Sequence, residues 1–437
     1  MKVPRRIAAA VINSLKGGVV PRIGLPHITV GRATEINALL HDVDIVADGG
    51  ASFRFIVGRY GSGKSFLLQT IRNYVMDRNF AVADADLSPE RRLQGGQGQG
   101  LATYRELIQN LSTKTRPEGG ALPLILDRWL NGVQNEAAAE SGLAFDAPAF
   151  RPLMDRKIFE MISSLDEMTH GFDFARLLSL YYRARLAGDD ESQARVVKWF
   201  RGEYATRREA RAELGVGVII TDEDWYEQVK ILAVFLRRAG YRGLMILIDE
   251  LVNICKIPNS LTRQYNYEKI LAIYNDALQG KARYLGFIMG GTPQSLEDRR
   301  RGLFSYEALR SRLEEGRFSR DGLKDVLAPV IRLSPLTYEE MLVLIEKLAD
   351  LHADLFEYRR TLGQDELINF IKIEFGRLGA DRHLTPREVI RDFIEVLNIV
   401  HQNPGLKVAG LLESGGFSHA RPELQAEARE YAEFELT

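Results

Sequence analysis

The sequence predicts an α/β fold with a parallel β-sheet, and three observations support this prediction. Short apolar runs of strand length alternate with helical patterns between residues 53 and 289. A glycine-rich motif lies directly between the first of these strands and the helix that follows it. A later strand ends in two consecutive carboxylates, Asp249 and Glu250. Alternating strands and helices favour a parallel sheet with helices on its faces.

The composition is that of an ordinary globular protein. The chain has 437 residues, of which 45% are hydrophobic and 27% are charged, and about 150 residues per domain gives an expectation of two to three domains. These values exclude a disordered, a collagen-like and a membrane-embedded chain. No apolar run approaches the ~18 residues that span a bilayer, and the apolar stretch 7–12 is too short for a secretory signal. We therefore expect no membrane partner.

Cysteine content and charge narrow the function classes. Cys255 is the single cysteine, so no intrachain disulfide is expected and the chain suits a reducing, cytoplasmic location. With one cysteine and scattered histidines, we expect no zinc site. Lys plus Arg total 58 and Asp plus Glu total 59, which gives a net charge of -1. This balance excludes a uniformly basic nucleic-acid-binding surface but leaves a local basic patch open.

Residues 1–50 are predicted to form an N-terminal helical segment that leads into an α/β core, residues 51–333. Glycine pairs at 17–18 and 49–50 end its two expected helices, 2–15 and 34–46. The core then begins with two strand–helix pairs. In order, these are a strand over 53–57, a helix over 66–76, a strand over 80–86 and a helix over 103–112.

The middle of the chain carries few strand signals. The glycine/glutamine stretch 95–100 is either a pore or substrate loop or a linker. Residues 117–215 are charged and mostly helical in pattern, which predicts a large helical insertion. Within it, the arginines of 201–211 are interleaved with aromatic residues, namely Trp199, Phe200 and Tyr204. This segment would either bind nucleic acid by charge and stacking or form a solvated helix face beside buried aromatics.

Strands and helices alternate again from residue 221. Residues 221–224, with the sequence Thr-Asp-Glu-Asp, form an expected N-cap region for a helix over 225–239. A strand over 244–248, a helix over 267–278 and a strand over 285–289 follow. After Ser334 the strand signals end. Three helical patterns, 338–351, 364–375 and 386–400, predict a helical lid domain over 334–404, and a polar tail is expected over 405–437.

The glycine-rich motif fits G-x-x-x-x-G-K-[ST], the phosphate-binding loop or Walker A motif. Its glycines let backbone N–H groups converge on phosphate oxygens, and the following helix N-terminus adds a favourable dipole. Lys64 would reach the β- and γ-phosphates of ATP, and the Ser65 hydroxyl would ligate Mg²⁺. The alternative is a chance glycine-rich turn. The residues predicted to bind nucleotide here are Gly58, Tyr60, Gly61, Ser62, Gly63, Lys64, Ser65 and Phe66.

The carboxylates Asp249 and Glu250 end the apolar strand 244–248. In a protein with a phosphate-binding loop, such a Walker B pair holds the magnesium and orients the attacking water. We therefore assign Asp249 to Mg²⁺ and Glu250 to the water that attacks the γ-phosphate. The alternative is an acidic strand end that caps the next helix.

Four further residues complete the predicted site. Thr292 follows the strand 285–289 and would sense the γ-phosphate, or it is a turn threonine before a proline. Arg310 and Arg312 are candidates for an arginine supplied in trans to the γ-phosphate. Their alternative is a solvated basic face or contacts to a nucleic-acid backbone. Arg387 begins the last helix of the lid, from which it would reach the nucleotide, or it is a surface arginine.

Taken in order, these motifs resemble those of an AAA+ ATPase. The entry Val30-Gly31-Arg32 with Glu35 resembles that of initiator-type modules related to origin-recognition proteins. More specifically, the chain resembles the ATP-binding proteins of BREX phage-resistance systems, of the BrxD type, over nearly its whole length to residue 404. The most specific strings are RFIVGRYGSGKSFLL at 54–68, PEGGAL at 117–122 and RGLFSYEALRSRL at 301–313.

The resemblance implies an AAA+ P-loop NTPase core with a large helical insertion and a C-terminal helical lid. It implies a Mg²⁺-dependent ATPase of bacterial or archaeal phage defence that acts on DNA as a loader or remodeller with a partner helicase, and it leaves a homo-oligomer open. It also places Val20 and Pro21 near the adenine. Initiators carry a winged-helix domain after the lid, for which the tail 405–437 is too short. That departure favours the alternative of a slow nucleotide-gated switch or scaffold that binds a protein partner.

Overall fold

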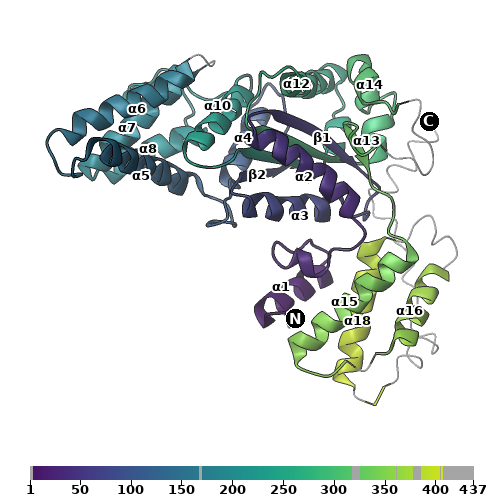
Figure 1. Cartoon of the computed structure of the whole chain (residues 1–437). Coiled ribbons are helices and arrows are strands. Elements are labelled where there is room, and N and C mark those ends of the chain that lie inside the picture. The colour runs from purple at the N-terminus through teal and green to yellow at the C-terminus, as the bar shows by residue number, and fades with distance from the viewer. Residues whose placement is uncertain are drawn as a thin grey trace. The chain divides into compact units, whose positions relative to one another are not determined.

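A computed structural model of the chain describes residues 3–166, 170–316, 325–360, 362–376, 385–403 and 405–406 (Figure 1). The chain forms two compact units. Arg32–Ser334 make up one, here called the α/β unit, and Met1–Gly31 with Pro335–Thr437 make up the other, here called the helical unit. Most of the predicted tail, 407–437, lies outside the described residues.

The α/β unit is built on a sheet of five parallel strands, which confirms the predicted fold class. The strands are β1 (Ala51–Val57), β2 (Ala81–Asp86), β3 (Leu244–Asp249), β4 (Leu285–Gly291) and β5 (Val330–Arg332). Their order across the sheet is β2-β3-β4-β1-β5. The sequence analysis does not predict β5, because a three-residue strand carries no pattern of its own and depends on pairing with β1.

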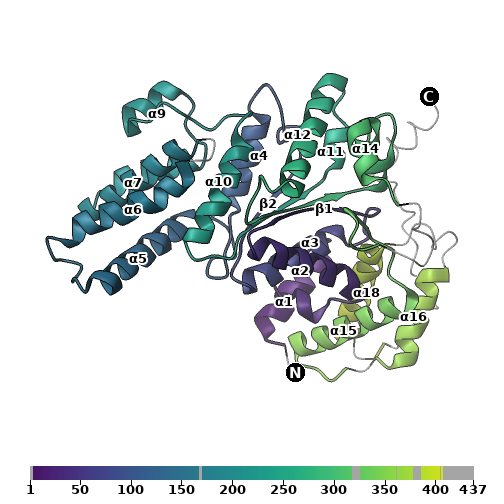
Figure 2. The ribbon, with the colours of Figure 1, turned by 45° about the horizontal axis from the view of Figure 1, so that its top comes forward.

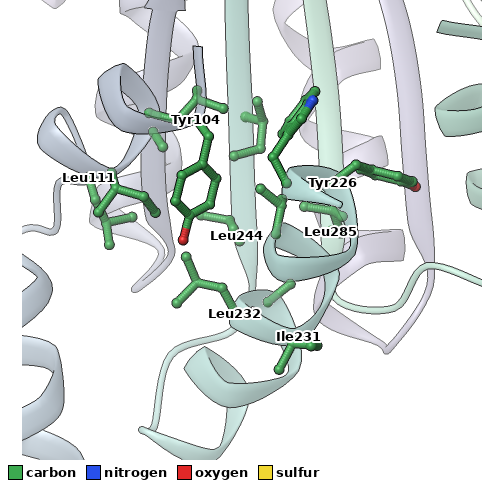
Figure 3. Close-up of a cluster of buried hydrophobic side chains, with 14 of the residues drawn as sticks. Tyr104, Leu111, Tyr226, Ile231, Leu232, Leu244 and Leu285 are labelled. Atoms are coloured by element: carbon green, nitrogen blue, oxygen red, sulfur yellow. The ribbon is translucent and has the colours of Figure 1, made fainter. Parts of the chain in front are cut away.

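Helices cover both faces of the sheet, so its strands are buried on both sides and read as continuous apolar runs. On one face lie α2 (Ala33–Ala47) and α3 (Lys64–Asp77), and on the other lie α4 (Gln99–Gln109), α10 (Trp225–Arg238) and α12 (Ser260–Leu278) (Figure 1 and Figure 2). Figure 3 shows part of the core on the second face. Its side chains include Tyr104 and Leu111, Tyr226 and Leu232 of α10, Leu244 of β3 and Leu285 of β4.

Four short elements follow the carboxyl ends of β3 and β4. They are α11 (Val252–Cys255), α13 (Pro293–Glu297), the 3-10 turn η2 (Leu303–Ser305) and α14 (Glu307–Leu313). Helix α11 packs against α12 and α13, and α14 packs against α12 and η2. These contacts place the segments that follow β3 and β4 next to α12.

Five helices lie between α4 and α10, in the stretch predicted to be a helical insertion. They are α5 (Leu122–Ser141), α6 (Phe150–Asp166), α7 (Gly171–Ala187), α8 (Asp190–Phe200) and α9 (Arg207–Leu214). Each of α5 to α8 packs on its neighbour in the chain, and Figure 2 shows the group beyond α10, on the β2 side of the sheet. Buried aromatic residues hold it together, among them Trp129, Phe174 and Phe200.

The aromatics interleaved with the arginines of 201–211 belong to this core. Trp199, Phe200 and Tyr204 are each at most 3% exposed. The Trp199 indole Nε1 donates to Val218 O at 2.7 Å, and the Tyr204 hydroxyl lies 2.7 Å from Glu213 Oε2. The stacking proposed for nucleic-acid binding therefore does not apply, because rings with these partners and this burial offer no face to a base. The solvated helix face with buried aromatics is the correct alternative.

Helix α10 begins at Trp225, directly after the expected N-cap region, but the acidic side chains of that region do not cap it. Asp224 stands at the N-cap position, but its carboxylate accepts instead from Thr221 N at 2.6 Å. Asp222 accepts from Gly98 N at 2.8 Å and from Leu101 N at 2.7 Å, and so caps the start of α4. The start of α4 and the segment before α10 are distant in sequence but lie in contact. The later segment supplies the acid that caps α4.

The same contacts anchor the glycine/glutamine stretch 95–100. Besides Asp222 at one end, the buried Asn266 of α12 accepts from Leu93 N at 2.9 Å and from Gln94 N at 3.0 Å at the other. The Trp225 indole donates to Leu93 O at 2.9 Å. Residues 95–98 therefore form a loop that is fixed at its base, with Gly96 and Gln97 exposed at its tip, and Gln99 begins α4.

The helical unit is formed from both ends of the sequence. It contains α1 (Arg5–Lys16), the 3-10 turn η1 (Leu25–His27), α15 (Tyr338–Phe356), α16 (Gln364–Gly376) and α18 (Pro386–Gln402). The apolar face of α1 packs against α15 and α18. The predicted segment 1–50 is therefore divided, because α1 belongs to the helical unit and α2 packs on the sheet. No helix among the described residues is long and apolar enough to cross a membrane.

Candidate nucleotide-binding site

The predicted site residues of the α/β unit gather at one edge of the sheet. The strands are parallel, so the segments after β1, β3 and β4 leave the same edge, and this is where ligands bind in open α/β sheets. The phosphate-binding loop (residues 58–63, here the P-loop) follows β1, the pair Asp249 and Glu250 ends β3, and Thr292 follows β4. Since β4 lies between β1 and β3, Thr292 lies between the other two segments.

The P-loop backbone takes the shape that its glycines allow. Gly61 and Gly63 have φ values of 72° and 92°, which residues with side chains rarely adopt. Gly63 is the N-cap residue of α3, so the loop ends where the free N–H groups and positive dipole of that helix begin. At Gly58 a Cβ atom would overlap the Ser62 hydroxyl. Each of these glycines is therefore required by the backbone or by packing.

Two side chains of the site have polar atoms suited to phosphate. Ser62 Oγ is buried and has no hydrogen-bond partner in the part of the chain that the structure describes. The Lys64 ammonium donates to Gly58 O at 2.9 Å and to Arg59 O at 3.1 Å, and lies 5.3 Å from the centre of the Tyr60 ring. Neutral carbonyl groups are weaker acceptors for an ammonium than phosphate oxygens, since charge-assisted hydrogen bonds are stronger.

Ser65 and Asp249 meet across the site. The Ser65 hydroxyl donates to Asp249 Oδ2 at 2.7 Å, and the Glu250 backbone N–H donates to Asp249 Oδ1 at 2.9 Å. Asp249 is buried, and a Cβ atom at Gly290 on the neighbouring strand would overlap its Oδ1 atom. Both carboxylate oxygens are thus fixed in position, and the two predicted metal ligands are direct neighbours.

Glu250 has an unusual backbone conformation. Its φ is 59°, in the left-handed region that few residues other than glycine adopt. Such conformations cost about 1–3 kcal/mol and cluster at functional sites. The turn at Glu250 directs the chain from the end of β3 into α11, and its N–H at the same time holds Asp249.

A third carboxylate, Asp86, lies beside Asp249. Asp86 ends β2 and is the register partner of Asp249 in the parallel pairing of β2 with β3. Partial desolvation, and then the neighbouring Asp249 and Asp84 carboxylates, raise the pKa of Asp86 above its usual value. The sequence analysis identifies Asp86 only as the end of a strand, because strand order is not visible in the sequence.

Thr292 is buried, and its hydroxyl serves as a helix cap. Thr292 Oγ1 accepts from Ser295 N at 3.2 Å, and the Ser295 hydroxyl donates back to Thr292 O at 2.7 Å. Thr292 is therefore the N-cap residue of α13. The cap accounts for a threonine at this position, and the sensing role stays a prediction.

Arg310 and Arg312 make their contacts within α14. Arg310 forms an ion pair with Glu307 at 2.7 Å, and Arg312 donates to Ala308 O at 2.6 Å. Arg310 is half-buried and Arg312 is exposed. Helix α14, which carries both arginines, packs against α12 and η2. Their role as arginines supplied in trans stays a prediction.

The remaining predicted residues differ in exposure. Tyr60 is 45% exposed at the P-loop, and Phe66 is half-buried in the first turn of α3. In the helical unit, Val20 is half-buried and Pro21 is buried in the turn after α1. Arg387 is exposed in the first turn of α18, after a capping box formed by Thr385 and Glu388. The roles of these residues at the nucleotide stay predictions.

Sequence reasoning missed one residue that touches the P-loop directly. The Arg32 guanidinium Nη2 donates to Ser62 O at 3.0 Å and to Ser334 O at 2.8 Å. Arg32 appears in the sequence only as part of the motif shared with initiator-type modules. Its partners lie 30 and 302 residues away, so no local pattern marks the contact.

Comparison with known proteins identifies the family. No curated protein matches the chain. The family model for the BREX system ATP-binding protein BrxC/D matches residues 3–415. That match covers the P-loop, the carboxylate pair, the five inserted helices and the described helices of the helical unit. With most of its length matched, the chain belongs to the BrxC/D family of BREX system ATP-binding proteins.

Proposed function

We propose that this chain is a Mg²⁺-dependent AAA+ ATPase of a cytoplasmic BREX phage-defence system. The observation that carries the proposal is the 2.7 Å contact between Ser65 Oγ and Asp249 Oδ2, beside the P-loop lysine. A hydroxyl and a carboxylate in this relation are the protein ligands with which P-loop ATPases hold magnesium. Membership of an ATP-binding family supports ATP as the nucleotide.

The residues present fit the magnesium nucleotide. Mg²⁺ takes oxygen ligands and is usually bound by one or two protein groups together with phosphate oxygens and waters, and Ser65 and Asp249 offer oxygens of this kind. The ion, when bound, supplies positive charge to the β- and γ-phosphates. The partnerless Ser62 hydroxyl and the Lys64 ammonium fit phosphate oxygens.

In the proposed reaction, Glu250 accepts a proton from water while the water oxygen bonds to the γ-phosphorus. The bond from the γ-phosphorus to the bridging oxygen breaks, and ADP and phosphate leave. Lys64 exchanges its carbonyl partners for phosphate oxygens and offsets their charge. Asp249 keeps Ser65 in place, and its own orientation is held by the Glu250 N–H.

We further propose that hydrolysis drives loading or remodelling of DNA with a partner helicase, in a homo-oligomer. An arginine supplied by a neighbouring copy stabilises transition-state charge in many P-loop ATPases. The position of Arg310 and Arg312 on α14, with contacts inside their own helix, supports this arrangement. The phage-defence role of the family supports DNA as the target.

One observation favours a second function, a slow nucleotide-gated switch that binds a protein partner. The aromatics that lie among the arginines of 201–211 in the sequence, Trp199, Phe200 and Tyr204, are buried. The net charge of the chain is -1. A DNA-binding function therefore has to use another surface of the protein.

Steady-state ATP hydrolysis by the full chain tests both functions. Rates are measured with and without double-stranded and single-stranded DNA, at low and moderate salt, with Lys64→Ala as the control. Stimulation by DNA that declines with salt supports the DNA-acting ATPase. ATP binding with slow hydrolysis that is indifferent to DNA supports the switch. A folded wild-type chain that binds no ATP overturns both proposals.

Glu250→Gln tests the assigned base within the same assay. The glutamine keeps the size of the side chain but cannot accept the proton from water. We expect the hydrolysis rate to fall about 10²–10⁴-fold, the usual contribution of a general base, while ATP binding is retained. Wild-type hydrolysis by this variant would remove Glu250 from the mechanism.

A further inference from the structure

The Arg32 guanidinium joins three segments of the α/β unit. Nη2 donates to Ser62 O in the P-loop at 3.0 Å and to Ser334 O at 2.8 Å, and Nη1 lies 3.5 Å from Glu35 Oε1. The residue is 6% exposed. A buried charge needs such partners, because an unpaired one is costly. These partners offset the cost of burying the Arg32 charge.

Arg32 and its partner Ser334 are the two ends of the α/β unit. The chain enters the unit at Arg32 and leaves it after Ser334. The exit is also tied to the strand that carries the P-loop, since Leu333 N donates to Val57 O at 2.8 Å. One side chain thus connects the P-loop to both points at which the chain passes between the units.

The P-loop partner is a peptide group whose orientation matters for phosphate binding. A peptide bond is planar, so the Ser62 carbonyl and the Gly63 N–H rotate together and point in opposite directions. Holding Ser62 O on Arg32 therefore fixes the direction of the Gly63 N–H at the start of α3. Conversely, a phosphate that turns this N–H moves the carbonyl that Arg32 holds.

We propose that Arg32 is a positioning residue that couples occupancy of the P-loop to the two chain crossings at Arg32 and Ser334. The proposal rests on nucleotide binding by the P-loop. A nucleotide that reorients the Ser62–Gly63 peptide changes its bond to Arg32, and the change reaches Ser334 through the same Nη2 atom.

Hydrogen–deuterium exchange of the full chain tests the coupling. Exchange is measured with and without a non-hydrolysable ATP analogue and Mg²⁺, for the wild type, Arg32→Gln and Glu35→Gln. Peptides covering 58–66 report binding, and peptides covering 28–36 and 330–340 report the crossings. In the wild type we expect nucleotide to slow exchange at both sets of peptides, about tenfold at the crossings, the effect of one hydrogen bond to a charged donor.

The variants separate coupling from binding. In Arg32→Gln, the 58–66 peptides are expected to keep their protection by nucleotide while the crossings lose theirs. Glu35→Gln removes the ion pair but leaves both carbonyl bonds, so it is expected to behave as the wild type. If nucleotide still slows exchange of the 28–36 and 330–340 peptides in Arg32→Gln, the proposal is overturned. A folded Arg32→Gln protein whose 58–66 peptides no longer respond also overturns it, because Arg32 then serves binding itself. A wild-type chain with no response at 58–66 contradicts the proposed ATP binding instead.

Discussion

The geometry of Asp249 depends on a residue that carries no side chain. Ser65 Oγ holds one oxygen of the carboxylate and the Glu250 N–H holds the other. The space for Oδ1 exists because position 290, on the neighbouring strand β4, is glycine. The consecutive site residues 58–65 and 249–250 are predictable, since each lies in a short motif. The glycine that admits Asp249, the cap at Thr292 and the contacts of Arg32 depend on distant pairings that no local pattern encodes.

Gly290→Ala is therefore expected to damage the site although it replaces none of the functional residues. The added methyl group would overlap Asp249 Oδ1 and displace the carboxylate from Ser65. Misplacing a positioned group by about 1 Å costs about 10²-fold in rate. We expect a loss of this size in ATP hydrolysis and weaker binding of Mn²⁺, measured by electron paramagnetic resonance as a probe for magnesium.

Gly96→Ala is the matched control for this variant. A Cβ atom at Gly96 has no atom within 4 Å, and the residue is exposed at the tip of its loop. It should retain wild-type hydrolysis and metal binding. Equal losses of hydrolysis and metal binding in the two variants would show that the overlap with Asp249 is not their cause.

At the scale of elements, strand existence is predictable and strand partners are not. The apolar runs of β1 to β4 mark them in the sequence, because strands covered on both faces are mostly apolar. By contrast, β5 has three residues and exists through its pairing with β1. The order β2-β3-β4-β1-β5, which brings Asp86 beside Asp249, likewise follows from packing alone.

Asp222 precedes α10 in the sequence but caps α4 in the structure. Its contribution to stability can be tested. Asp222→Ala removes the acceptor of the Gly98 and Leu101 N–H groups. Both groups are part-buried and lose this hydrogen bond. Loss of an N-cap costs about 0.5–2 kcal/mol. We expect the free energy of unfolding, measured by urea denaturation, to fall by that amount. Glu223→Ala, the exposed neighbouring acid, should stay within about 0.5 kcal/mol of the wild type. A larger effect of Glu223→Ala would contradict the assigned cap.

At the scale of the whole molecule, the chain begins and ends in the same unit. Helix α1 packs on α15 and α18, more than three hundred residues later in the sequence. Its buried residues, Ala8, Val11, Ile12 and Leu15, form one face at helical spacing. That spacing predicts an amphipathic helix but not the partner of its apolar face. For this reason 1–50 is predicted as one segment that leads into the core, while the structure divides it.

Ile12→Asp tests this division. Ile12 is 2% exposed in the helical unit, and a buried unpaired carboxylate is strongly destabilising. We expect faster hydrogen exchange in α15 and α18, with β1, β3 and β4 unchanged, because those strands belong to the other unit. Asn13→Asp, on the exposed side of the same helix, introduces the same charge and should leave both units as in the wild type. Faster exchange in β1, β3 and β4 of the Ile12→Asp protein would show that α1 stabilises the sheet, and the N-terminal segment would then belong with the core.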